Sequence, residues 1–124
     1  MRLNHWTNAS GLEGVLRDRL IRATWPTETS VAIPDRVVWL TTRTDSDQGW
    51  KFNESLCAYL IVEVPDEEVV AWSQYRQELP WAVPGVLEDS ALRNGNGDPA
   101  TWFVLRRGIP EAEWLEIVDL RDAS

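Results

Sequence analysis

The stretch LNHWT, residues 3–7, predicts the strand around which we interpret the rest of the chain. Side chains alternate between the two faces of a strand, so Leu3, His5 and Thr7 share one face while Asn4 and Trp6 share the other. His5 is the single histidine of the chain. An imidazole that can donate and accept hydrogen bonds therefore stands beside a hydroxyl on one rigid element. The same pattern also fits a structural histidine that is hydrogen-bonded near a strand end.

The length and composition predict one domain of ordinary soluble character. A chain of 124 residues is long enough for one modest core, and we expect a single domain over residues 1–124. No apolar run approaches the roughly 18 residues that span a membrane. The first residues also lack the layout of a signal peptide. Cys57 is the only cysteine, which suits a reducing compartment. We therefore expect a cytoplasmic protein with no membrane partner.

The charge and the metal-ligating residues restrict the functional classes. A formal net charge of −8 argues against broad nucleic-acid binding, which depends on neutralising phosphates with lysine and arginine. It leaves room for a small anionic ligand held by a few local donors. One histidine and one cysteine do not supply a typical zinc site, so we expect no metal. Eight tryptophans are many for this length. Most of them should be core residues, and one or two are available to stack on a planar ligand.

A helix is predicted directly after the first strand. Ser10 and Glu13 match the capping-box pattern, in which two side chains satisfy free N–H groups at a helix start. Apolar residues then follow at helical spacing and should pack one face of the helix onto the core: Leu12, Val15, Leu16 and Leu20. Gly11 and Gly14 weaken this helix.

The middle of the chain predicts two strands and a second helix. Residues 36–42 are rich in β-branched and aromatic side chains, with Trp39 and Thr41 on one face of the expected strand. Residues 58–64 are almost continuously apolar, which is typical of a central strand. The acidic run after Pro65 favours a helix start, and we expect a helix over residues 67–77 that buries Val69, Trp72 and Tyr75.

The last third of the chain predicts further strands. Residues 94–99, NGNGDP, are the clearest turn signal, and a strand should follow over residues 101–106. Residues 110–114 are expected to form one helical turn, and residues 115–120 to form the last strand. The whole pattern predicts an α+β fold.

The order of these features resembles the ADP-ribosyltransferase fold. A His-x-Thr pattern on the first strand (His5-Trp6-Thr7), a short helix, and then a strand that ends in Thr41-Thr42 are similar to the first two motifs of that family. The likeness covers residues 1–64 and is faint beyond them. It is strongest to the rifampicin ADP-ribosyltransferases and the small DNA-modifying toxins. It implies split antiparallel β-sheets with two or three short helices, and NAD as co-substrate.

The resemblance also implies a set of site residues. His5 would be the catalytic residue, and His5 and Thr7 would bind the ribose and carboxamide of the nicotinamide half. Trp39 would stack on the nicotinamide, and Thr41 would add a polar contact. The family usually completes its site with a glutamate on a late strand, whereas this chain has Thr101 there. Asp98 and Glu63 are the nearest acids in the pattern, and neither is assigned as the missing acid. The second departure is Arg19, where the family often has glycine.

Other functions stay open at this stage. The main alternative is a non-catalytic interaction domain, an inhibitor or adaptor that keeps the fold, because an acidic surface with exposed tryptophans suits a protein interface. An RNA 2′-phosphotransferase-like enzyme favours several basic residues around a phosphate, and few are available here. A sugar-binding module with tryptophan stacking platforms is a third reading. The acceptor of ADP-ribose, a protein among the candidates, is not identified by the sequence.

Overall fold

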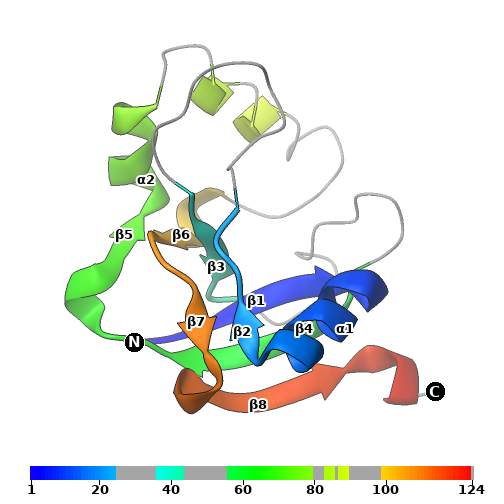
Figure 1. The fold of residues 1–124 in the computed structure, drawn as a ribbon. Coiled ribbons are helices and arrows are strands. Elements are labelled where there is room, and N and C mark those ends of the chain that lie inside the picture. The colour runs from blue at the N-terminus through cyan, green and yellow to red at the C-terminus, as the bar shows by residue number, and fades with distance from the viewer. Residues whose placement is uncertain (25–35, 44–55, 80–82, 86, 90–98, 124) are drawn as a thin grey trace.

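β1 (Arg2–Asn8) lies in the middle of a six-stranded antiparallel sheet (Figure 1). The computed structural model describes residues 1–24, 36–43, 56–79, 83–85, 87–89 and 99–123. The strand order is β5-β6-β3-β1-β4-β8, and every pairing is antiparallel. Together with its short helices this sheet forms a small single-domain α+β fold, as the sequence predicted.

One half of the sheet is built on β1, β4 (Leu56–Glu63) and β8 (Trp114–Asp119). β1 and β4 pair along the whole length of β1, with His5 opposite Leu60. β8 continues the sheet on the other side of β4, from Ala58 opposite Asp119 to Val62 opposite Trp114. The central position predicted for residues 58–64 is thereby confirmed, since β4 has a strand on each side.

The other half contains β3 (Val38–Thr41), β6 (Trp102–Leu105) and β5 (Val69–Ala71). β3 and β6 pair over all four residues of each strand. β1 and β3 share a single register pair, Asn4 opposite Thr41. The two halves therefore diverge from one junction, and Figure 1 shows β3 running across the direction of β1 and β4.

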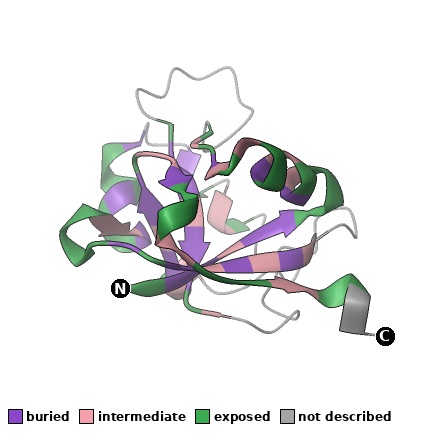
Figure 2. Ribbon diagram, turned by 60° about the horizontal axis from the view of Figure 1, so that its bottom comes forward, coloured by how far each residue is buried: buried purple, intermediate pink, exposed green. Residues whose placement is uncertain are grey.

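Two hydrophobic clusters lie on opposite faces of β3. Val38 and Leu40 point into a core formed with Leu3, Leu60 and other residues of β1, β4 and α1. The second cluster gathers around Trp72 and Trp102, with Trp39 packed against it. The alternation predicted for residues 36–42 is confirmed. Figure 2 shows the buried central strands and the more exposed strand near the C-terminus.

α1 (Ala9–Asp18) packs Leu12 and Val15 onto the sheet, as predicted. The predicted capping box at Ser10 is wrong, because the N-cap is Asn8, whose side-chain Oδ1 accepts from the N–H of Gly11 at 2.7 Å. Leu16 was expected on the buried face and is 41% exposed. The N-cap thus lies two residues before Ser10, at the last residue of β1, so α1 follows β1 without a loop.

α1 ends at Asp18 because Arg19 adopts a left-handed conformation, with φ 56° and ψ 35°. The chain then enters β2 (Leu20–Ile21), which pairs with β7 (Ile109–Pro110) in a separate two-stranded sheet. Gly108 approaches β2 so closely that a Cβ there would lie 2.9 Å from the carbonyl oxygen of Ile21. Leu20 therefore belongs to this small sheet, and the prediction that it extends the helical face is wrong.

The continuous helix predicted for residues 67–77 is also wrong. The segment divides into a 3₁₀ turn η2 (Asp66–Glu68), the strand β5, the short helix α2 (Trp72–Tyr75) and a second 3₁₀ turn η3 (Arg76–Glu78). Val69 and Val70 pair with β6, and pairing with a formed strand favours β-branched residues in extended conformation. Burial of Trp72 and Tyr75 is confirmed.

The late elements follow the predicted order with small shifts of their ends. η4 (Pro99–Thr101) precedes β6, η5 (Glu111–Glu113) forms the predicted helical turn, and η6 (Leu120–Ala123) follows β8. Residues 83–85 and 87–89 are helical. Most of the predicted turn over residues 94–99 lies outside the described residues. In the described part of the chain, no helix is long and apolar enough to cross a membrane.

Candidate functional site

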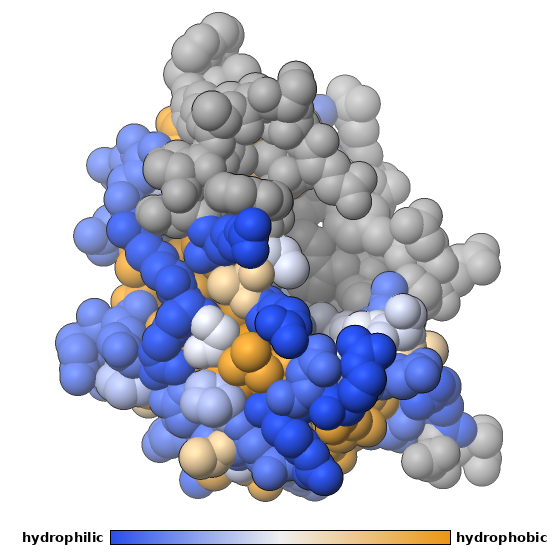
Figure 3. Space-filling model, viewed as in Figure 1, coloured by the Kyte–Doolittle hydropathy of each residue, from blue (hydrophilic) through white to orange (hydrophobic). Residues whose placement is uncertain are grey.

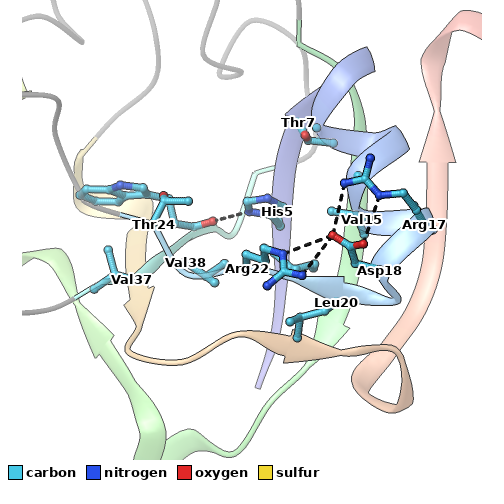
Figure 4. A pocket seen from close by; sticks show the side chains of 14 residues that line it. His5, Thr7, Val15, Arg17, Asp18, Leu20, Arg22, Thr24, Val37 and Val38 are labelled. Atoms are coloured by element: carbon cyan, nitrogen blue, oxygen red, sulfur yellow. Dashed lines mark hydrogen bonds and ion pairs between the residues drawn. The ribbon is translucent and has the colours of Figure 1, made fainter.

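A cavity of about 320 Å³ opens between β1, α1, β2 and β3 (Figure 4). His5 and Thr7 of β1 line it, together with Trp39 of β3. The walls also include glycine and apolar residues of α1, β2 and β3, and three charged residues that are described below. The structure thus brings together three of the four residues named from the sequence.

The imidazole of His5 is fixed by the backbone of β3. Its Nδ1 lies 2.9 Å from the carbonyl oxygen of Trp39. A carbonyl oxygen only accepts, so Nδ1 carries the hydrogen and the neutral ring keeps Nε2 as an acceptor. Burial lowers the pKa of His5 below its ordinary value of 6.5, and the hydrogen bond to Trp39 opposes this shift in part. At neutral pH the cavity is therefore lined by an uncharged imidazole with one acceptor nitrogen.

Thr7 lies beside the first turn of α1, next to a glycine that makes room for it. A Cβ at Gly11 would lie 2.1 Å from the hydroxyl oxygen of Thr7, far closer than two such atoms approach. The hydroxyl donates a long hydrogen bond of 3.4 Å to the carbonyl oxygen of Asn8. The glycine that weakens the helix is thus required by the position of the threonine.

Trp39 joins the cavity to the aromatic cluster. Its ring centroid lies 5.5 Å from that of Trp72, 5.9 Å from that of Trp102 and 6.4 Å from that of Tyr75. The side chain is half-buried, and tilted or edge-on contacts of this kind hold a ring in a fixed orientation. Any ligand that stacks on Trp39 would meet a ring with restricted movement.

Three charged residues of the cavity were missed by the sequence reasoning. Arg17 and Asp18 end α1, and Arg22 follows β2. Arg17 Nε donates to Asp18 Oδ1 at 3.1 Å, and Arg22 Nη2 lies 3.2 Å from Asp18 Oδ2. These hydrogen bonds, the one from Arg17 above all, lower the pKa of Asp18. The spacing of Asp18 and Arg22 would suggest a pair on one helix, but α1 ends at Asp18, so no helical pattern indicated that they meet at this cavity.

Thr41 lies elsewhere, although it was named as a cofactor-binding residue. It is buried and does not line the cavity. Its hydroxyl lies 3.2 Å from the hydroxyl oxygen of Thr101 and accepts from the N–H of Arg43 at 3.2 Å. Thr101 is the residue at which the resemblance leads one to expect an acid. A pair of neutral hydroxyls therefore occupies this part of the sheet junction.

Comparisons with protein-family models, with curated proteins and with solved structures find no match for the chain. Among the described residues, no three histidine, cysteine, aspartate or glutamate side chains gather in a group that could hold a metal ion.

Proposed function

We propose that the cavity binds NAD through its nicotinamide riboside half, and that the protein transfers ADP-ribose from NAD to an acceptor. His5 carries this proposal, because its Nε2 is an acceptor that suits a ribose hydroxyl. Thr7 supplies a second polar group for the ribose or the carboxamide, and Trp39 supplies the ring for the nicotinamide. A ligand that has both sugar hydroxyls and a planar ring would contact His5, Thr7 and Trp39 together.

The size of the cavity fits one part of a dinucleotide. Ligand pockets generally measure about 300–1,000 Å³, so about 320 Å³ is at the small end of that range. The nicotinamide riboside portion is the part with a planar ring and the reacting bond. The adenosine portion would then lie outside the cavity.

The transfer reaction needs little covalent chemistry from the protein. The bond between ribose C1′ and the nicotinamide nitrogen breaks, and its electron pair leaves with nicotinamide. A nucleophilic group of the acceptor then forms a bond to C1′ and releases its proton to a base or to water. The protein has to orient the ribose and to exclude water from the cationic sugar, which the fixed His5 and the ring of Trp39 favour.

A matched pair of variants tests NAD binding. His5→Asn keeps an N–H donor near the carbonyl oxygen of Trp39 but removes Nε2, whereas His5→Ala removes both groups. Calorimetric titration with NAD should show micromolar-range binding to the wild type and its loss in both variants, with His5→Asn remaining folded by circular dichroism. Undiminished NAD affinity in folded His5→Asn, or no binding heat from the wild type, would refute the proposal.

A second candidate is a non-catalytic interaction domain with the same fold. The hydroxyl pair of Thr41 and Thr101 favours it, because the expected acid is absent from that position. β8 ends the sheet and carries exposed apolar side chains, with Leu115 50% and Ile117 39% exposed. In the coloured part of Figure 3, which has the same view as Figure 1, hydrophilic residues cover most of the surface and smaller apolar areas lie among them.

Release of nicotinamide separates the two candidates. Incubation with NAD labelled in the nicotinamide ring should yield free nicotinamide if the domain is a transferase, with water as the slow substitute acceptor. Binding of NAD without release, in the presence or absence of cell extract, would assign the non-catalytic role.

A further inference from the structure

We propose that Arg17 and Arg22 form a phosphate subsite at the edge of the cavity. That the natural ligand is NAD rests on the proposed function. In the NAD complex this subsite would bind the pyrophosphate. The two arginines select a ligand with phosphate groups that together have two or more negative charges.

The two arginines reach one carboxylate from different segments of the chain. Arg17 lies on α1 and Arg22 follows β2, and Figure 4 shows both guanidinium groups directed toward Asp18. Asp18 is 25% exposed, whereas the side chains of Arg17 and Arg22 are 72% and 66% exposed. The carboxylate is therefore the inner member of the group, and the cations face solvent at the edge of the cavity.

The residues that line the cavity have a net positive charge, whereas the chain as a whole has a net negative charge. Its charged lining residues are two arginines and one aspartate, which leave one net positive charge because His5 is neutral. The chain as a whole has a formal net charge of −8. Positive charge at the edge of the cavity attracts a small anion to it, and Glu13, which lies outside the lining, offsets part of this charge at Arg17.

The guanidinium groups keep donors for a ligand. Each guanidinium has five N–H bonds. Arg17 uses Nε and Nη2 on Asp18, and Arg22 does the same. On this count each side chain retains three N–H bonds for another acceptor. Since Asp18 already holds both side chains in place, binding needs less ordering of long flexible chains.

The presence of Asp18 also selects the ligand. A ligand with a single carboxylate has one negative charge, the same charge that Asp18 already places beside the two arginines. Pyrophosphate brings at least two negative charges and several acceptor oxygens, so it can engage both guanidinium groups while Asp18 remains ionised. The pKa of Asp18 is lowered, which keeps its carboxylate charged at neutral pH.

The test uses inorganic pyrophosphate and the intact chain. We expect calorimetric binding to the wild type that weakens by about tenfold or more in the Arg17→Gln/Arg22→Gln double variant, and that weakens as salt is raised. Arg121→Gln is the matched control, because Arg121 pairs with neighbouring Asp119 in the same manner but outside the cavity. Its affinity should equal that of the wild type. Absence of pyrophosphate binding, or equal affinity in the double variant, would overturn the subsite.

Two further ligands separate this proposal from the proposed function. Nicotinamide riboside, which has no phosphate, should bind the double variant as well as the wild type and should fail to bind His5→Asn. The affinity for NAD should be lower than that of the wild type in both the double variant and His5→Asn. NAD affinity unchanged in the double variant refutes the subsite alone, whereas pyrophosphate binding without NAD binding supports the subsite and refutes the nucleotide function.

Discussion

The Nδ1 of His5 and the carbonyl oxygen of Trp39, 2.9 Å apart, connect the two halves of the sheet beside the junction of β1 and β3. The backbone register holds these strands together at one residue pair, Asn4 opposite Thr41. The hydrogen bond from His5 adds a connection on the cavity side, while Asn4 and Trp6 donate to the carbonyl oxygen of Arg43 beyond the end of β3. The same contact fixes the tautomer on which the proposed ligand contact depends.

Replacement of His5 should therefore affect stability as well as binding. In His5→Ala the carbonyl oxygen of Trp39 loses the hydrogen bond from His5, which should lower the free energy of unfolding by about 0.5–1.5 kcal/mol. His5→Asn retains a donor and should lose less. Urea unfolding of the two variants measures the difference, and equal stabilities would show that the hydrogen bond contributes little.

The lowered pKa of His5 predicts a loss of stability on mild acidification. The unfolded chain takes up the proton near pH 6.5, whereas the folded protein takes it up only at a lower pH. The stabilisation is complete above pH 6.5 and is lost as the pH falls from 6.5 toward the folded pKa. Urea unfolding between pH 7 and pH 5 should show this decline in the wild type and a flatter profile in His5→Asn. Parallel profiles would contradict the assignment.

The two helical glycines that were treated alike in the sequence should respond oppositely to alanine. At Gly11 a Cβ would overlap the hydroxyl of Thr7, so Gly11→Ala should destabilise the protein despite the better helix propensity of alanine. At Gly14 the nearest atom to a Cβ is Arg17 Nη2 at 3.8 Å, an ordinary contact. Gly14→Ala should therefore raise the free energy of unfolding by roughly 0.5–1 kcal/mol.

Thermal unfolding of the two variants checks this prediction. A Thr7→Ala/Gly11→Ala double variant should recover part of the stability lost in Gly11→Ala, because the overlapping oxygen is gone. Gly11→Ala with the stability of the wild type would mean that Thr7 moves aside at little cost.

At position 19 the backbone conformation favours glycine over any residue with a Cβ. Arg19 is in the left-handed region, and a Cβ there costs on the order of 1 kcal/mol relative to glycine. Its ion pair with Glu111 is exposed and contributes little, generally about 0–1 kcal/mol. Arg19→Gly should be more stable than Arg19→Ala by about 1 kcal/mol, since both lose the ion pair and only alanine keeps the Cβ. Chemical denaturation compares them, and a more stable alanine variant would be the contrary result.

Much of the fold was predictable where neighbours along the chain decide the structure. The alternation in residues 3–7 and 36–42 placed His5 and Thr7 on one face and separated Trp39 from Val38 and Leu40. These predictions held because a strand alternates its side chains whatever it pairs with. The helix over residues 67–77 failed for the opposite reason. Val69 and Val70 become a strand because β6 is available beside them.

The candidate site was predictable only in part. His5, Thr7 and Trp39 line the cavity, whereas Thr41 points to Thr101, the last residue of η4 directly before β6. The partners of Thr41 depend on how β3 pairs with β6, sixty residues later in the chain, and local periodicity carries no information on that pairing. The charged group around Asp18 was missed because α1 ends at Asp18 and Arg22 lies beyond β2.

The sequence by itself determined the local terms: which residues alternate on β1 and β3, that a helix follows the first strand, and that the chain is acidic with one histidine. These follow from short-range sterics, hydrophobic periodicity and composition. Only the tertiary structure decided that the carbonyl of Trp39 holds His5, that the hydroxyl of Thr7 needs Gly11, and that Arg17 and Arg22 meet at Asp18. The first contact is set by the long-range pairing that brings β1 beside β3. The other two join residues close in sequence, and they depend on where β1 gives way to α1 and where α1 ends before β2.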